Sequence, residues 1–559
     1  MPIRFSIVLW LALLPLSGAG QSVNIPLNRD YYHLIERYEI LNGAFIPRIH
    51  TTVKPFQRQF VAEFADYLID SGTNWTRSDR FNLEYLSADS WEWSRHSYAD
   101  SKKPFLKMFY RKKPDMLHVE EEDFDLHVNP VFHFSAGKES ASDVTTYINT
   151  RGVEVRGMIA RRLGFYSYAA TTQAAFPLYV REKIAREGVV PNEGFWKKFK
   201  DYGVDYFTAR GYLSFDVVRN YVNAQMGFDR FSHGTGSRSL LLSDYAPGYT
   251  FLRFNTNIWR IQYTNLFAQG RADAFSNASG SVQGPYPDKF VASHHLSINI
   301  TDNLNLGLSE MVIAGDSVNG WFDISYLNPI IFYRALEHQG GSSENVLVGM
   351  DIRWNFLKRF SFYGQVMLDE FVLDQIRSGN GWWANKYGLQ TVLKYIDAFG
   401  LKNLDLHAEY NVIRPYSYAH VSEFTNYAHY RQPLAHALGA NLREFITSVR
   451  YQPVPRLTLA AQICLAGYGE DTVNSNWGKN VMKSYLTRQQ EYGNTIGQGV
   501  GVDLSYIDLL TSYQFRHNVF LDLRLVMRAT DSQNAGFERS TSYFSGSFRW
   551  NIPRLIHDF

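Results

Sequence analysis

Apolar and polar positions divide the chain into two parts with different periods. Residues 54–70 carry aromatic side chains on one stripe at the spacing of an amphipathic helix, and residues 78–93 repeat this pattern. Ser78 is a candidate N-cap for the second of these helices, and a shorter helix is expected at residues 30–39. Helices this short cannot bury their apolar stripes alone, so we expect them to pack together or on the rest of the protein.

From about residue 104 onward, apolar and polar residues alternate with a period of two. In residues 123–136 apolar side chains alternate with Asp, His, Asn and Ser, and four later segments alternate in the same way, at residues 346–355, 404–412, 519–528 and 544–552. Such strands have one apolar and one polar face, which suits either a water-soluble sandwich or a lipid-embedded barrel. The polar face mixes Asp, Glu, Arg and His, as a lumen of paired charges would, and this favours the barrel.

The connections between the strands support the barrel. Tight turns are expected near residues 163–164, 255–257, 301–303, 452–456 and 516–518. Long loops are expected at residues 173–208, 229–248, 268–289, 315–345, 371–385, 414–441 and 468–499. Short turns at one end and long loops at the other are typical of outer-membrane barrels. Laying strands between these connections gives eighteen, with residues 145–162 as one strand bulged at Arg151 and Gly152.

The first twenty residues read as a secretory signal peptide. Arg4 supplies a positive start, residues 5–16 are apolar, and small residues follow at positions 18–20. No later apolar run reaches eighteen residues, so no transmembrane helix is expected. The predicted organisation is therefore a signal peptide at 1–20, a periplasmic helical segment at 21–103 and an all-β, antiparallel transmembrane β-barrel at 104–559. The predicted location is the outer membrane of a Gram-negative bacterium, with the long loops outside the cell.

The amino-acid composition excludes several classes of function. The 559 residues contain 56 Lys and Arg against 54 Asp and Glu, a net charge of +2 that argues against a nucleic-acid partner. The single cysteine, Cys464, excludes an intramolecular disulfide and a thiolate metal cage. Aromatic residues make up 16% of the chain, which suits an outer-membrane barrel with its aromatic girdles. The mean hydropathy of −0.27 is too polar for a helical membrane protein.

Motifs for catalysis or metal binding are not found in the sequence. His294 and His295 are adjacent, so on a strand they point to opposite faces and cannot share a metal ion. Asp369 and Glu370 are separated in the same way, which disfavours a glycosidase pair. There is also no Gly-x-Ser-x-Gly or His-Glu-x-x-His string. We therefore expect a non-enzymatic protein without a metal or cofactor.

Five strings resemble a known family. Residues 234–244, 326–334 and 343–349 resemble the Wzi-like capsule assembly family, and residues 363–370 and 409–416 look like its branch that includes the gliding-motility protein RemB. The strings are more similar to the RemB-like branch, and the resemblance covers about residues 120–559. It implies an eighteen-stranded outer-membrane barrel with a small periplasmic helical bundle, and a non-enzymatic role. Members of the family hold capsular polysaccharide at the cell surface as lectins or, in the RemB-like branch, act in surface motility.

Aromatic and planar polar side chains in the predicted external loops are candidates for glycan binding. Aromatic faces stack on sugar C–H surfaces, and planar polar groups pair with hydroxyls. The candidates are Trp382, Trp383, Asn385, Arg414, Tyr416, Tyr418, His420 and Tyr430. The alternative for any one of them is that it packs the loops over the barrel mouth or belongs to the outer girdle.

Charged side chains on the polar faces form a second group. Arg353, Asp369, Asp405, Glu409 and Arg524 are expected to project into the lumen and to pair there with opposite charges. Glu310 instead falls on an apolar phase, so a bulge or a loop boundary is expected to turn it inward.

Three functions remain open from the sequence. The first is a surface protein that binds or organises capsular or exopolysaccharide. The second is a structural component of gliding-motility or secretion machinery, with other proteins as partners. The third is a porin-like channel, because eighteen strands enclose enough space for one. In each case outer-membrane lipid surrounds the barrel, and an outer-membrane hydrolase is a distant fourth possibility.

Overall fold

The fold was obtained as a computed structural model that describes residues 22–46, 48–272, 288–315, 344–370, 372–422 and 424–559. The expected signal peptide, residues 1–20, lies outside the described residues, as does the string at 326–334.

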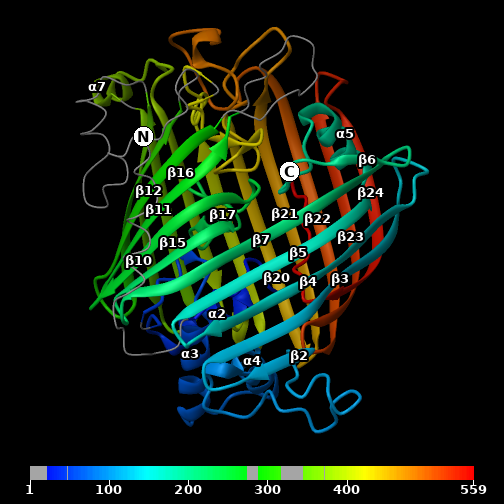
Figure 1. Ribbon diagram of the computed structural model, residues 1–559. Helices are drawn as coiled ribbons and strands as arrows, with labels where there is room; N and C mark the ends of the chain where they lie inside the picture. Colours follow the sequence, from blue (N-terminus) through cyan, green and yellow to red (C-terminus); the bar gives the residue numbers. More distant parts are fainter. Residues whose placement is uncertain (1–21, 47, 273–287, 316–343, 371, 423) are drawn as a thin grey trace, which may run out of the picture.

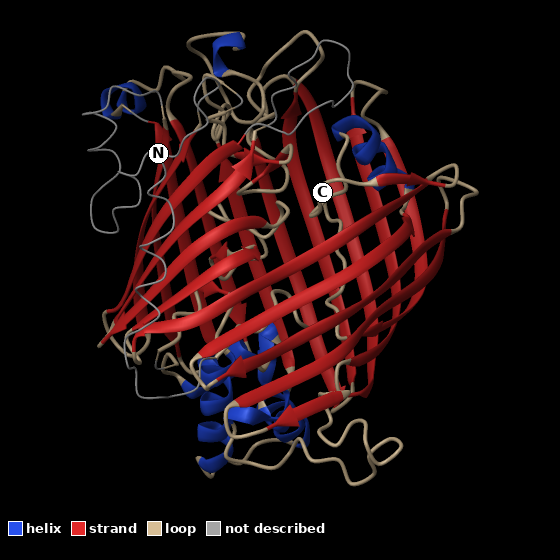
Figure 2. Cartoon of the chain, in the orientation of Figure 1, coloured by secondary structure: helices blue, strands red, loops and turns tan. Residues whose placement is uncertain are grey.

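Long antiparallel strands form a closed barrel, in which β24 pairs with β3 to complete the ring (Figures 1 and 2). The eighteen long strands among the described residues are β3 (Phe124–Glu139), β4 (Thr146–Ile159), β5 (Leu163–Ala175), β7 (Gly203–Val218), β8 (Val222–Asp229), β10 (Tyr249–Ile258), β11 (Ile261–Arg271), β12 (Asp288–Asn299), β13 (Leu304–Ala314), β14 (Asn345–Phe356), β15 (Phe360–Glu370), β16 (Lys386–Tyr395), β17 (Leu404–Ile413), β20 (Leu442–Val454), β21 (Leu457–Glu470), β22 (Val500–Arg516), β23 (Val519–Ser532) and β24 (Arg539–Trp550). Short strands β2 (Leu117–Glu120) and β6 (Lys197–Phe199) add to β3 and β7. The predicted fold class is confirmed.

The period-two pattern produces the two surfaces of the wall. On β14 the side chains of Val348, Met350 and Trp354 are 41–46% exposed, whereas Asp351 and Arg353 between them are almost completely buried. Strands of this kind place apolar groups outside and polar groups in the lumen.

Two local expectations for the strands were wrong. β4 pairs with β3 and β5 without a register shift, so there is no bulge at residues 151–152. Gly152 allows the close approach of β5 instead, since a Cβ there would lie 2.4 Å from the carbonyl oxygen of Ala169. β13 is also regular through Glu310, which stays on the phase of Leu308 rather than turning inward. Its direct cross-strand neighbour is His294, a polar partner that makes this position tolerable.

Three helices close the end of the barrel that carries the tight turns (Figure 1). They are α2 (Tyr32–Asn42), α3 (Arg58–Asp70) and α4 (Arg77–Asp89), followed by the short η2 (Trp91–Trp93). α4 begins with a capping box in which Thr76 accepts from the backbone of Asp79, so the cap is Thr76 rather than Ser78. No helix among the described residues is long and apolar enough to cross a membrane.

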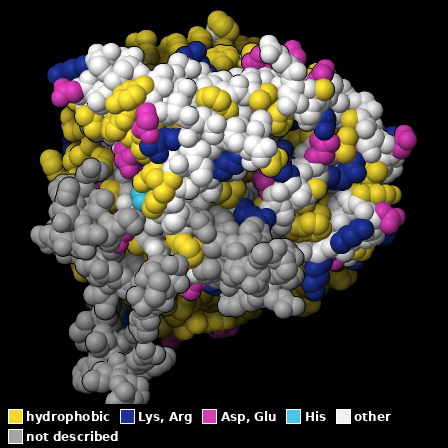
Figure 3. All heavy atoms as spheres, turned by 90° about the horizontal axis from the view of Figure 1, so that it is seen from above, with side chains coloured by type: hydrophobic (Ala, Val, Ile, Leu, Met, Phe, Trp, Pro, Cys, Tyr) yellow, Lys and Arg dark blue, Asp and Glu magenta, His cyan; other side chains and the backbone are white. Residues whose placement is uncertain are grey.

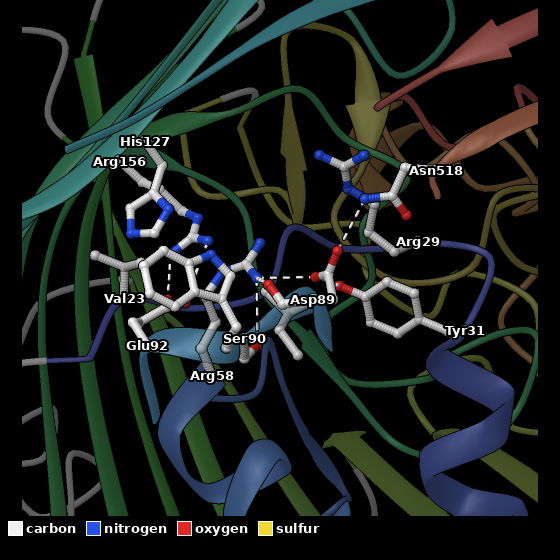
Figure 4. A network of polar contacts seen from close by, with 12 residues as sticks. Val23, Arg29, Tyr31, Arg58, Asp89, Ser90, Glu92, His127, Arg156 and Asn518 are labelled. Atoms are coloured by element: carbon white, nitrogen blue, oxygen red, sulfur yellow. Dashed lines mark hydrogen bonds and ion pairs between the residues drawn. The ribbon is translucent and has the colours of Figure 1, made fainter. Parts of the chain in front are cut away.

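A buried polar network joins these helices to the barrel (Figure 4). The carboxylate of Asp89, at the end of α4, accepts hydrogen bonds from Arg58 (2.9 Å), Tyr31 (2.5 Å) and Asn518 (2.8 Å). Asn518 belongs to the turn between β22 and β23, so one carboxylate connects two helical segments with the barrel.

The opposite end of the barrel carries the long connections. They include α5 (Leu178–Glu187), α7 (Leu373–Arg377), η5 (Tyr485–Thr487) and the small hairpin of β18 (Ala428–His429) and β19 (Gln432–Pro433). We call this the long-loop end. Its predicted position outside the cell stays a prediction.

Segments from both ends meet inside the lumen. β1 (Val53–Lys54), from the helical segment, pairs with β9 (Ser232–His233), from the loop between β8 and β10. Two tyrosines of another loop hold the same inserted loop: Tyr418 and Tyr427 donate to the carbonyls of Leu240 and Leu241 (2.9 and 2.6 Å). The inserted loop, residues 230–248, therefore forms part of a lumen plug.

The last residues of the chain also run inside the barrel (Figure 1). Beyond β24, the arginines of β23 and β24 hold the backbone of residues 551–559. Arg549, Arg524 and Arg528 each donate to one carbonyl of this tail, at 3.0 Å. Phe559 ends the tail and is buried among loop residues.

Candidate functional site

The predicted lumen charges lie inside the barrel, and several pair with the plug. Arg353 forms an ion pair with Glu39 of α2, and Asp405 forms one with Arg37 of the same helix. These strand charges therefore anchor the helical segment, and the predicted pairing across the lumen is wrong for these two residues.

Glu409, Arg524 and Asp369 hold other inserted segments. The carboxylate of Glu409 accepts from the backbone N–H groups of Ser237 (2.6 Å) and Arg238 (3.1 Å) in the inserted loop. Arg524 pairs with Asp508 (2.9 Å) and also donates to the tail. Asp369 pairs with buried Lys386 (3.1 Å) and accepts from the backbone of Tyr418.

Arg238 is the most heavily bonded side chain of the inserted loop. Its guanidinium pairs with Glu444 of β20 (2.9 Å) and with Asp558 of the tail (2.8 Å). Glu444 also contacts His436 (2.8 Å) and the thiol of Cys464 (3.2 Å). One arginine thus ties a loop and the tail to the wall.

At the long-loop end, an aromatic and basic cluster brings together two loops. The rings of Trp383 and Tyr485 lie 4.9 Å apart, and the guanidinium of Arg488 lies 4.2 Å from the centre of the Trp383 ring. Trp382 contacts Trp383 with ring centres 6.3 Å apart. All four side chains are half-buried, so part of each faces solvent. We call Trp382, Trp383, Tyr485 and Arg488 the loop-end cluster.

Arg414 supports this cluster from below. Its guanidinium donates to three backbone carbonyls, those of Trp382 (3.1 Å), Asn385 (3.1 Å) and Asn494 (2.9 Å). These carbonyls belong to both loops of the cluster, so Arg414 sets how the two loops meet.

The remaining predicted glycan-binding residues differ in how far they are exposed to solvent. Asn385, Tyr416, Tyr418 and His420 are buried and bonded within the loops. Tyr416, for example, donates to the carbonyl of Asn476 (3.0 Å). Burial, together with Lys386, lowers the pKa of His420 to about 4, and the neutral ring shares a hydrogen bond with Thr425 (2.6 Å). Half-buried Tyr430 lines a different cavity, beside Phe195 and Gly248.

Trp382 and Trp383 were predicted from the sequence as ligand-binding residues, whereas Arg488 was not. Arg488 directly follows the short turn η5 that contains Tyr485, and no pattern in the sequence indicates that its side chain reaches Trp383. The loop-end surface combines apolar, basic and acidic side chains (Figure 3). Indole faces beside a guanidinium can stack on sugar rings and bind hydroxyl or carboxylate groups.

The lumen retains a cavity of about 480 Å³ between the plug segments and the wall. Its charged lining is mixed, with six arginines (Arg29, Arg210, Arg230, Arg238, Arg450 and Arg554) and five acidic residues (Asp30, Glu154, Glu193, Asp244 and Asp558), and tyrosines such as Tyr166, Tyr168 and Tyr206 lie between them. Within the described part of the chain, no group of three or more His, Cys, Asp or Glu side chains is arranged to hold a metal ion.

Comparison with solved structures gives several similar barrels. Wzi of Escherichia coli, described as a carbohydrate-binding β-barrel involved in group 1 capsule assembly, aligns over 96% of this chain and 100% of its own, with a TM-score of 0.56 and 13% identity. OprD of Pseudomonas aeruginosa aligns over 76% of this chain and 94% of its own (TM-score 0.42, 9% identity). OccAB2 of Acinetobacter baumannii aligns over 77% and 99% (TM-score 0.42, 7% identity).

No protein-family profile matches the sequence, and no curated protein matches it either. At 13% identity the similarity to Wzi is one of fold: both chains are barrels with nearly the whole of each chain aligned.

Proposed function

We propose that this protein is an outer-membrane barrel that binds surface polysaccharide through its loop-end cluster, without catalysing a reaction. The long-loop end would face outward and the helices would face the periplasm. The observation that carries the proposal is the half-buried set of Trp382, Trp383, Tyr485 and Arg488. The similarity of the fold to Wzi, a carbohydrate-binding barrel, supports it.

The filled lumen favours surface binding over a free channel. The helical segment, the inserted loop and the tail all contact the wall from inside. A porin-like function would require these segments to move. The motility or secretion role of a RemB-like branch stays a prediction from the strings at residues 363–370 and 409–416.

Direct binding tests the proposal. The full chain in neutral detergent is titrated with polysaccharide extracted from the surface of the source bacterium, with and without W382A/W383A. We expect the variant to bind about tenfold more weakly, because buried aromatic anchors contribute most of the energy of such contacts.

The matched control is Val473→Ala, since Val473 is 96% exposed and lies in a long loop that also contributes to the cluster. This variant should bind like the original protein. If the double variant and the control bind equally well, the loop-end cluster is not the glycan site.

A further inference from the structure

A basic loop between η2 and β2 extends beyond the strands at the end of the barrel that the helices close (Figure 1). The backbone N–H of Ser101 donates to the carbonyl of Arg111 (2.9 Å). The backbone N–H of Lys113 donates to the carbonyl of Ala99 (2.7 Å), so the two arms of the loop run antiparallel. We call residues 99–113 the basic hairpin.

The charge of the basic hairpin is of one sign. Residues 101–114 contain no Asp or Glu and six basic residues: Lys102, Lys103, Lys107, Arg111, Lys112 and Lys113. Among the described residues, Lys112 alone of these six has a carboxylate within 4.0 Å, that of Asp100 (2.5 Å). An acidic run at residues 120–123 lies at the other end of β2, where Arg161 donates to the carbonyl of Glu122 (3.0 Å). Five cations of the hairpin therefore have no ion-pair partner in the described part of the chain.

Large apolar side chains are exposed at the tip of the hairpin. Phe105, Leu106 and Met108 are 59%, 71% and 53% exposed. The lysines around them, which we call the tip lysines, are exposed as well: Lys102, Lys103 and Lys107. Exposed apolar groups beside lysines are typical of a segment in a membrane interface, where the apolar groups enter the acyl boundary and the cations stay with the phosphates.

The hairpin lies against the outer face of the barrel wall. The ring of Tyr110 stacks on that of Trp550, with ring centres 5.9 Å apart and planes 25° apart. Trp550 ends β24 on the outward phase of exposed Phe544, whereas Arg549 before it is buried in the lumen. The outward ring of Phe132 also contacts Trp550, at 6.0 Å. Aromatic side chains in this position form the girdle of a barrel at the membrane interface, so the stacking holds the hairpin beside that interface.

The arms of the hairpin are fixed to the protein, whereas the tip lysines are free. The ammonium group of Lys112 lies 4.4 Å from the centre of the Trp91 ring. The ammonium group of Lys113 donates to the carbonyl of Tyr98 (2.6 Å). The tip lysines have no ion pair within the described ranges, so their ammonium groups are available to an anion outside the protein.

We propose that the basic hairpin binds the acidic phospholipid surface of the periplasmic leaflet. Phe105, Leu106 and Met108 enter the boundary between headgroups and acyl chains, and the tip lysines bind lipid phosphates. The stacking of Tyr110 on the outward girdle favours lipid over an acidic protein as the occupant. The inference rests on the membrane location and orientation in the proposed function but not on polysaccharide binding.

Photo-crosslinking from three exposed aromatic positions tests the contact with lipid. Phe105 lies in the tip, Phe544 lies on the outer face of β24, and Tyr67 lies on α3 in the helical segment. Each residue is replaced in turn by p-benzoylphenylalanine in the full chain. The protein is placed in nanodiscs of phosphatidylethanolamine with a minor fraction of phosphatidylglycerol, and the adducts are identified by mass spectrometry.

We expect lipid adducts at Phe105 and Phe544, and none at Tyr67. Adducts at Phe544 without any at Phe105, or equal adducts at Tyr67 and Phe105, would overturn the inference alone. Loss of adducts at both Phe105 and Phe544 would contradict the membrane location as well. In cells, adducts of Phe105 with a protein instead of lipid would assign the hairpin to a protein partner and overturn the lipid surface.

The charge requirement has a matched control. K102Q/K103Q/K107Q removes the tip lysines, and K197Q/K198Q/K200Q removes three exposed lysines near the long-loop end. In the original chain, the share of phosphatidylglycerol among the adducts at Phe105 should exceed its share of the bilayer about threefold, because nearby lysines attract acidic headgroups. The first variant should abolish this enrichment and the control should keep it. Adducts in the bilayer ratio in the original chain, or an equal effect of both variants, would overturn the preference for acidic lipid.

Discussion

At the scale of single residues, Arg414 joins the two loops of the loop-end cluster, because three loop carbonyls accept hydrogen bonds from its guanidinium. The sequence had instead predicted Arg414 as a planar group that binds ligand. One of those carbonyls belongs to Asn494, eighty residues away, and nothing in a local string points to it. The same reason explains why Tyr416 and Tyr418 are buried rather than presented to a ligand.

Arg414→Ala should loosen the loops at residues 371–385 and 471–499 while the barrel stays folded. Losing the charge-assisted bonds should cost about 2 kcal/mol of local stability. Limited proteolysis should then cut these loops faster. Arg219→Ala, in an exposed turn at the other end, is the control, and equal cutting of both variants would contradict the assignment of Arg414 as a loop clamp.

Asp89 is the central residue of the buried polar network that joins the helices to the barrel. Asp89→Ala leaves Arg58 buried without a counter-charge and should destabilise the helical segment by about 3 kcal/mol or more. The helical circular dichroism signal should melt earlier than the β signal. Asp70→Ala is the matched control, because Asp70 pairs with Arg95 at the surface, where ion pairs contribute little. A similar effect of both variants would argue against the network.

The same end of the barrel predicts that the stability of the helical segment depends on pH. Burial alone would raise the pKa of Asp89, but Arg58 beside it holds that pKa below the ordinary range. Burial would also raise the pKa of Asp115, which precedes β2, but its ion pair with His127 of β3 (2.7 Å) holds that pKa below the ordinary range as well. Carboxyl groups with lowered pKa values stabilise the fold above their unfolded pKa, about 4, and lose this contribution as the pH falls below it. Helical signal should therefore be lost on acidification before β signal. Simultaneous loss of both signals would contradict this order.

At the scale of elements, the regular strands could be predicted because apolar and polar residues alternate along them. Strands such as β14 and β22 alternate over many residues, and β12 places His294 and His295 on opposite faces, as their adjacency implies. The segments that form the lumen plug have no such alternating pattern in their sequence. β1 and β9 are two residues each and lie about 180 residues apart in sequence, so their pairing depends on the closed barrel that brings them together.

Arg238 should control how tightly the inserted loop is held. Arg238→Ala removes its contacts with Glu444 and Asp558 and should raise the rate at which a small maleimide alkylates buried Cys464 about tenfold. Ser237→Ala is the matched control, because Ser237 uses its backbone N–H to bind Glu409. Unchanged labelling in Arg238→Ala would mean that the loop is held by other contacts.

At the scale of the whole molecule, strand number and turn alternation followed from the sequence because a closed barrel imposes both. The helical segment was also expected, but its position against the lumen charges was not, since ion pairs such as Arg353 with Glu39 join positions far apart in the chain. The binding surface was predicted only in part. Trp382 and Trp383 meet Arg488 because two loops fold together. Loop conformations have no repeating sequence pattern from which this contact could be predicted.

The most direct test of the proposed function is made on cells. The gene is deleted, and surface polysaccharide is measured as cell-attached and as released into the medium. The deletion strain is then complemented with the original chain or with W382A/W383A. We expect deletion to move polysaccharide into the medium, the original chain to restore attachment, and the variant to fail at equal abundance in the outer membrane. Unchanged attachment in the deletion strain would contradict the central claim.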